Sequence, residues 1–213
     1  MIEIRHKRTG ALILEVPGDR LAGARLPQAA LHGGTLQGAD LRGIDLRFGD
    51  LCRMIFTGAD LRGADLTGAD LSYCEARGAD LRGATLSDAR ALGADFSQAR
   101  FDGADLGNSR WVTACLDGAS FENARMVRTD LTHARARGAV FAGAELTGAD
   151  LSHADLTGAA LDFADLTRAM LVRTSLRGAS ARGADWSCAC LNRVEADLRE
   201  LDAARVGGAV VAA

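Results

Sequence analysis

A large apolar residue recurs at every fifth position from Leu21 to Leu191, and no insertion or deletion interrupts this register. The residue is usually Leu, with Phe, Trp, Met or, occasionally, Ala in its place. An amphipathic helix requires apolar residues three and four positions apart and a strand requires them two apart, so a strict spacing of five fits neither. The spacing instead predicts a solenoid, in which the chain turns a corner once per repeat and stacks its coils about 4.8 Å apart.

The repeat unit is Ala-Asp-Leu-polar-Gly, which residues 58–72 spell out as GADLRGADLTGADLS. We expect the Leu and the small residue two positions before it to point toward the axis. The Asp between them and the two residues after the Leu are expected to face water or to form the turn. Along such a packed axis a large side chain must be offset by a small one on a neighbouring coil. Ala91 and Trp111, which are predicted to be stacked on adjacent coils, are an example.

A second period, of twenty residues, indicates how many repeats form one coil. The Gly of the unit occupies the third position of a four-residue turn, where a type II turn requires positive φ and therefore favours Gly. The turn positions fall into four series, each of which lists the residues at one corner of successive coils, twenty residues apart. The series that start at Gly23 and Gly38 are rich in Gly, whereas those that start at Gln28 and Gly33 are poor in it. This segregation predicts four repeats per coil, with type II turns at the two Gly-rich corners and other turn types at the remaining two.

The tandem A-D-L-x-G units, with a small residue before each Asp, resemble the pentapeptide-repeat proteins, and the resemblance covers about four fifths of the chain. It implies an all-β fold, the right-handed quadrilateral β-helix, here with about nine coils. We divide the chain into an N-terminal cap over residues 1–18, the solenoid over 19–193 and a C-terminal cap over 194–213.

Both ends of a solenoid expose strand edges and an open core, which require covering. Near the N-terminus, apolar residues alternate on both sides of Thr9-Gly10, which predicts a β-hairpin. Near the C-terminus, Val194, Leu198 and Leu201 have helical spacing, which predicts a short capping helix. Because caps in the resembling family often join two chains end to end, a homodimer through the C-terminal end is one expectation and a simple cap is the other.

Composition narrows the class of protein further. The five cysteines are odd in number and lack zinc-like pairing, so neither a disulfide framework nor a metal cluster is predicted. No signal-peptide pattern and no apolar run long enough to cross a bilayer is present, and we expect a cytoplasmic protein without membrane contact. The formal net charge is −3 and no basic patch dominates, which disfavours direct binding of nucleic acid.

The sequence predicts neither an enzyme nor a resident cofactor. Every repeat is filled and no long loop emerges, so a concave active site of the usual kind is not expected. The one suggestive cluster is Asp150, Ser152 and His153, with His133 one coil away on the same corner. Stacked histidines without a third ligand make a poor metal site, so we expect no catalytic residues and no metal.

We predict a non-enzymatic protein-binding solenoid, a rigid interaction scaffold whose partner the sequence does not identify. The two Gly-poor corners flank one side of the rod, where apolar residues are expected to face outward beside Arg and Tyr. Such a mixture is typical of interface cores. The candidate partner-binding residues are Phe48, Arg53, Tyr73, Arg90, Leu92, Arg110, Val112, Met170 and Val172.

The alternative function is mimicry of DNA. The resemblance implies it, because several pentapeptide-repeat proteins have the width and charge of B-form DNA, bind DNA gyrase or topoisomerase IV and protect them from quinolones or other gyrase poisons. Carboxylates on adjacent coils can imitate rows of phosphates, and the candidate acidic side carries Asp45, Asp65, Asp105, Glu145, Asp165 and Asp185. The small net charge, and arginines such as Arg42 beside the Asp columns, weigh against this function because they compensate the ladders.

Overall fold

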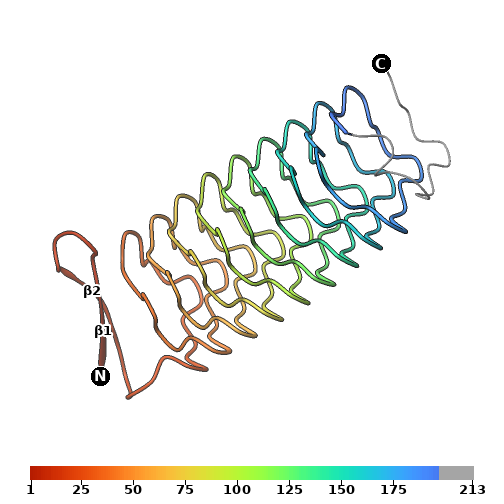
Figure 1. The fold of residues 1–213 in the computed structure, drawn as a ribbon. Helices are drawn as coiled ribbons and strands as arrows, with labels where there is room; N and C mark the ends of the chain where they lie inside the picture. The colour runs from red at the N-terminus through yellow and green to blue at the C-terminus, as the bar shows by residue number, and fades with distance from the viewer. Residues whose placement is uncertain (197–213) are drawn as a thin grey trace.

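The computed structural model describes residues 1–196, which form a rod of stacked coils with a hairpin at its N-terminal end (Figure 1). The coils follow one another in sequence order along the rod, so each coil contacts the one before it and the one after it. Contacts between neighbours alone are typical of solenoids.

The predicted hairpin consists of β1 (Ile2–Arg5) and β2 (Leu12–Val16), which pair antiparallel with Ile4 opposite Leu14. The hairpin is attached to the first coil through the backbone, since the Lys7 amide donates to the Gly33 carbonyl at 2.9 Å. Its side chains join the core, where Ile4 and Val16 are buried. The N-terminal end of the apolar axis is therefore in contact with the hairpin, as expected of a cap.

Each coil pairs with the next at a separation of twenty residues, from the bridge between Arg25 and Asp45 to the bridge between Ser175 and Glu195. Backbone groups bond in both directions: the Leu41 amide donates to the Asp60 carbonyl at 2.8 Å, and the Asp60 amide donates to the Ala39 carbonyl at 3.0 Å. This register confirms the four-repeat coil that the period of twenty predicts.

The turns differ from the sequence prediction at the two Gly-poor corners. Non-glycine residues there adopt the same positive φ as the glycines, for example 57° at Phe48 and 55° at Arg128. Positive φ at the third turn residue, with the Gly49 amide bonded to the Leu46 carbonyl at 3.1 Å, is the type II pattern. Other turn types were expected at these corners, and that prediction is wrong.

The ladder between coils explains why residues other than Gly accept this conformation. The amide of the third turn residue bonds to the next coil at each corner from Gly23 to Arg173, as the Phe48 amide does to the Thr67 carbonyl at 2.9 Å. A corner with a different turn would break that bond and displace the coil from its neighbours. Stacking therefore imposes the turn, against a local cost of about 1–3 kcal/mol for left-handed backbone at a non-glycine residue.

The axis is filled by the residues predicted to point inward, and Ala91 and Trp111 are both fully buried on the same ladder. The centroid of the Trp111 ring lies 5.0 Å from that of Phe96 and 5.4 Å from that of Phe101. The Phe101 ring is stacked on Phe121 at 4.8 Å. The middle of the rod thus contains an aromatic cluster that the small Ala91 accommodates.

At the C-terminal end the ladder extends two residues past the predicted boundary at 193, because Glu195 pairs with Ser175 and accepts a bond from the Leu176 amide at 2.7 Å. Val194 is partly buried against the core. The rest of the expected capping helix, including Leu198 and Leu201, lies outside the described residues. Over residues 1–196 no helix is long and apolar enough to cross a membrane.

Candidate functional site

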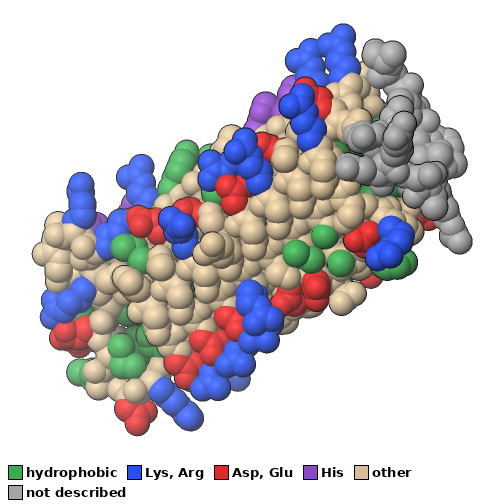
Figure 2. Space-filling model, viewed as in Figure 1, with side chains coloured by type: hydrophobic (Ala, Val, Ile, Leu, Met, Phe, Trp, Pro, Cys, Tyr) green, Lys and Arg blue, Asp and Glu red, His purple; other side chains and the backbone are tan. Residues whose placement is uncertain are grey.

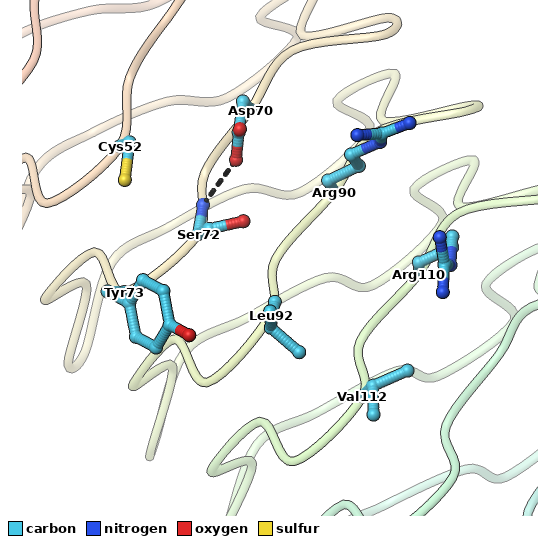
Figure 3. Close-up of a pocket in the computed structure, with 8 residues that line it drawn as sticks. All are labelled: Cys52, Asp70, Ser72, Tyr73, Arg90, Leu92, Arg110 and Val112. Carbon is cyan, nitrogen blue, oxygen red and sulfur yellow. Dashed lines mark hydrogen bonds between the residues drawn. The ribbon is translucent and has the colours of Figure 1, made fainter.

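The side of the rod between the two Gly-poor corners contains a cavity of about 320 Å³. We call this side the recessed face; its inward residues run from Leu31 to Leu191 in steps of twenty. A concave site was not expected from the filled repeats, so that expectation is wrong at this place. The cavity is lined by Cys52, Asp70, Ser72, Tyr73, Arg90, Leu92, Arg110 and Val112 (Figure 3).

Two columns of side chains build the recess (Figure 3). Asp70, Arg90 and Arg110 follow one another along a ladder of bridges, one residue from each coil. Ser72, Leu92 and Val112 occupy the neighbouring column, two residues further along the same three coils, and Cys52 precedes Ser72 in this column by one coil. The recess therefore has a charged column beside a column of small and aliphatic side chains.

The Tyr73 ring forms one wall of the recess at the corner. The residue has φ of 58° and a relative exposure of 51%. The guanidinium carbon of Arg53 lies 5.9 Å from the ring centroid, within the range of a cation–π contact. On the next coil, a Cβ added at Gly93 would lie 2.9 Å from a ring carbon of Tyr73. Glycine at this position thus lets the ring lie along the corner in a fixed place.

Arg90 and Arg110 form a pair of like charges on adjacent coils, which is unfavourable unless something compensates it. Arg110 is 3.7 Å from Asp130 through Nε, an ion-pair distance without a hydrogen bond. Arg90 makes no ion pair or side-chain hydrogen bond with any of the described residues. By contrast, Arg62 on another side holds both carboxylate oxygens of Asp60, at 2.8 and 2.6 Å. Arg90 therefore contributes a positive charge that no described residue compensates, and Arg110 contributes one that only Asp130 approaches.

The other polar groups of the recess are neutral or already occupied. Asp70 accepts the Ser72 amide at 2.9 Å. Burial, and then the nearby carboxylates of Asp70 and Asp50, raise the pKa of the Cys52 thiol, so Cys52 is protonated near neutral pH. Ser72 is 8% exposed, and its hydroxyl makes no bond with a described residue. The recess floor is thus uncharged apart from Asp70 and the two arginines.

Five of the nine predicted partner-binding residues line the recess, namely Tyr73, Arg90, Leu92, Arg110 and Val112. A sixth, Arg53, contacts the Tyr73 ring. Phe48 is exposed on the opposite corner of the recessed face, and Met170 and Val172 lie three coils beyond Arg110 and Val112 in the same columns. Cys52, Asp70 and Ser72 also line the recess, although their positions in the repeat do not distinguish them from surface residues elsewhere.

Exposed aromatic residues at the corners share a pattern that the sequence analysis missed. Phe48 and Phe163, like Tyr73, are each followed twenty residues later by Gly. A Cβ added at Gly68 would lie 2.5 Å from the Phe48 ring, and one at Gly183 would lie 2.8 Å from the Phe163 ring. Phe163, which is 65% exposed, stands out because its corner is otherwise Gly or Asn. The pattern of an aromatic residue followed by Gly twenty residues later could therefore have been found in the sequence.

The candidate acidic side lies along one ladder, but basic residues interrupt and pair with it. The ladder runs Arg25, Asp45, Asp65, Thr85, Asp105, Arg125, Glu145, Asp165 and Asp185. Arg47 bonds Asp45 at 2.8 Å and lowers the pKa of that carboxyl, and Arg125 bonds Asp105 at 2.9 Å. Acidic and basic side chains lie next to one another along the visible face of the rod (Figure 2). Much of the negative charge is therefore compensated locally.

The two corner histidines are stacked as the sequence predicts, with the ring centroids of His133 and His153 4.6 Å apart. Among residues 1–196, no group of three or more His, Cys, Asp or Glu side chains is arranged to hold a metal ion. Added zinc is expected to leave the thermal stability unchanged, because the histidine pair lacks the further ligands that zinc requires.

Comparisons with known proteins agree with the geometry. The family described as pentapeptide repeats matches the chain in eight copies between residues 20 and 195. The structure of HetL, a pentapeptide repeat protein involved in heterocyst differentiation regulation from the cyanobacterium Nostoc sp. strain PCC 7120, is 33% identical, with a TM-score of 0.63. The alignment covers 90% of this chain and 86% of HetL.

A more distant likeness concerns the fold alone. Two trypsin-treated forms of QnrB1, a plasmid-mediated fluoroquinolone resistance protein, are each 19% identical to the chain. Their TM-scores are 0.67 and 0.62, with coverage of 84% and 91% of this chain and 86% and 89% of QnrB1. No curated protein sequence matches the chain. The solenoid is thus the right-handed quadrilateral β-helix of these structures.

Proposed function

The chain belongs to the pentapeptide repeat family, and we propose that it is a non-enzymatic protein-binding rod whose protein partner docks on the recessed face. The observation that carries the proposal is the recess itself, where Tyr73, Leu92 and Val112 lie beside two arginines. Interface cores are enriched in aromatic residues and Arg, and anchoring residues cluster in pockets. HetL, a relative involved in regulation, supports a binding role of this kind.

The repeat makes the recessed face a rigid platform. Each coil is fixed by backbone bonds to its neighbours, so a partner would meet side chains whose backbone is already ordered. Binding to a preordered surface avoids part of the entropy cost of association. Departures from the repeat unit, such as Leu92 at a position usually occupied by a polar residue, are then the elements that distinguish this rod from others with the same fold.

The proposal is tested by affinity capture from the native cell with a variant that carries Leu92→Asp and Val112→Asp. Leu92 is 39% exposed and Val112 is partly exposed, so thermal stability should change little. The matched control is Val127→Asp, at the equivalent repeat position on the adjacent face. Loss of a partner with the double variant and its retention with the control supports the proposal. Equal capture by all three proteins contradicts it.

The second candidate is binding to a type II topoisomerase through the acidic side. The observation that favours it is the single ladder that contains Asp45, Asp65, Asp105, Glu145, Asp165 and Asp185. Pairing with Arg47 and Arg125 weakens the phosphate-like field of this ladder. A gyrase supercoiling assay with and without a quinolone tests it: protection from the drug at micromolar concentrations favours the topoisomerase, and no effect at those concentrations favours a different partner on the recessed face.

A further inference from the structure

The charges of the recess indicate what kind of segment it would bind. The basic pair of Arg90 and Arg110 lies between two carboxylates on the same ladder, Asp70 on one side and Asp130 on the other. Of the two arginines, Asp130 approaches Arg110, and it also accepts the amide and hydroxyl of Thr132. Asp70 accepts the Ser72 amide. Positive charge is therefore confined to two coils. A single carboxylate placed over Arg90 and Arg110 would compensate it and avoid both acidic neighbours.

The second column adds an apolar requirement. Leu92 and Val112 stand two residues after Arg90 and Arg110 on the same strands (Figure 3), with the Tyr73 ring at the corner. Side chains two apart on an extended strand point to the same side, about 6.6 Å from each other. An extended peptide that runs along these strands repeats this spacing. Its residues i and i+2 would reach the arginine column and the aliphatic column together.

Resting on the proposed function, we propose that the recess binds an extended acidic segment of the partner, in which a Glu or Asp side chain contacts Arg90 and Arg110 and an aliphatic side chain two residues away contacts Leu92, Val112 and Tyr73. The volume of about 320 Å³ is at the lower end of the usual range for ligand pockets, about 300–1,000 Å³. A recess of that size suits one or two side chains of a longer segment.

The structure provides further groups for such a segment. Arg90 has donors without a partner among the described residues, and a charge-assisted bidentate contact with a carboxylate would use them. The Ser72 hydroxyl also has no partner among the described residues and lies in the recess beside the aliphatic column. The Tyr73 ring is already positioned by Arg53 and Gly93, so its ordering costs little on binding.

The test is a titration of the intact protein with capped peptides, followed through the methyl NMR signals of Leu92 and Val112. The probe has Glu-Ser-Leu at its centre between Gly-Ser flanks, and three matched peptides carry Gln-Ser-Leu, Glu-Ser-Ser or Gln-Ser-Ser there. We expect saturable shifts for the first peptide and at least about tenfold weaker binding for the Gln-Ser-Leu peptide, since a lost charge-assisted bond weakens binding by this order.

A variant cycle assigns the effect to the arginine column. In Arg90→Gln, the preference for the Glu peptide over the Gln peptide should become clearly smaller, because only Arg110 remains to contact the carboxylate. Arg62→Gln, which removes the same charge on another side, should keep the full difference. Equal affinities of these two peptides for the unaltered protein overturn the inference. An absence of saturable shifts also overturns it. A third contradicting result is binding of an uncapped version of the peptide alone, because its C-terminal carboxylate would then be the group that binds.

The outcomes for this inference and for the proposed function are separable. If the double Asp variant loses its partner but the Glu-Ser-Leu peptide does not bind, the recessed face is an interface and the acidic segment is wrong. If the peptide binds with the expected dependence but the double variant keeps its partner, the ligand chemistry stands and the proposed role of the face fails.

Discussion

The hydroxyl of Ser109 provides the most specific prediction about stability. Ser109 replaces the usual inward Ala, and it is fully buried. Its Oγ accepts the indole N–H of Trp111 at 2.7 Å and donates to the Leu106 carbonyl at 2.5 Å. The Leu106 carbonyl also accepts the hydroxyl of Thr129 at 2.8 Å. The Ser109→Ala change would therefore orphan a buried indole N–H, while the carbonyl keeps another donor.

The expected cost follows from that asymmetry. A buried donor that loses its partner costs about 1–3 kcal/mol in the free energy of unfolding. For a chain of this size, each kcal/mol lowers Tm by about 2–4 °C. In a Trp111→Phe background the orphaned donor does not exist, so Ser109→Ala should cost about 1–2 kcal/mol less there than in the unaltered protein.

Urea unfolding of the four proteins in this cycle measures the coupling, with shifts of the midpoint compared at constant slope. Trp186 offers the reverse experiment. Its buried indole N–H has no partner among the described residues, and the residue two positions before it is Ala184, whereas the residue two positions before Trp111 is Ser109. We expect Ala184→Ser to stabilise the protein by about 0.5–1.5 kcal/mol. An equal cost of Ser109→Ala in both backgrounds would refute the reasoning.

Two further predictions concern the corner and the charged ladders. Gly93→Ala should lower Tm more than Gly83→Ala. Both glycines have positive φ, but only at Gly93 would an added Cβ meet neighbours within 4 Å, the Tyr73 ring at 2.9 Å and the Thr113 hydroxyl at 3.7 Å. Equal losses in thermal scans would contradict this reading. The side chain of Arg42 lowers the pKa of Asp40 from 3.8 to about 2. This contribution to stability is present above pH 3.8 and is lost as the pH falls toward 2. NMR titration of the carboxyl carbon in Arg42→Ala should show a pKa raised toward its ordinary value, while the backbone amide of residue 42 still lowers it.

The period of five predicts the architecture because the same spacing of inward residues is imposed on every coil. Inward Leu and Ala positions, the register of twenty and the pairing of Ala91 with Trp111 all follow from one repeated constraint. The corners were predicted wrongly at Phe48 and its equivalents, since local preference for Gly was taken to decide the turn. Bonds to the next coil decide it instead, and these bonds act between residues twenty apart.

The candidate site was predictable only in part. Exposed apolar residues and arginines at Gly-poor corners indicated the face, and Tyr73, Leu92 and Val112 lie in its recess. The sequence did not reveal the hollow, which depends on the sizes of Ser72 and its neighbours. Arg62 and Arg90 occupy different positions of the repeat, because Arg62 follows an inward Leu whereas Arg90 stands where the unit has Asp. The sequence therefore places Arg62 beside Asp60, and the two side chains do bond. That Arg90 has no such partner among the described residues is visible only in the side-chain geometry.

The central claim is that the partner contacts the recessed face, and site-specific photocrosslinking in the native cell tests it most directly. A photoreactive amino acid in place of Leu92 should crosslink to a protein partner, whereas the same group in place of Val127, at the equivalent position on the adjacent face, should not. Both proteins must retain the Tm of the unaltered chain. Crosslinking of the partner from position 127 and not from position 92 would contradict the account.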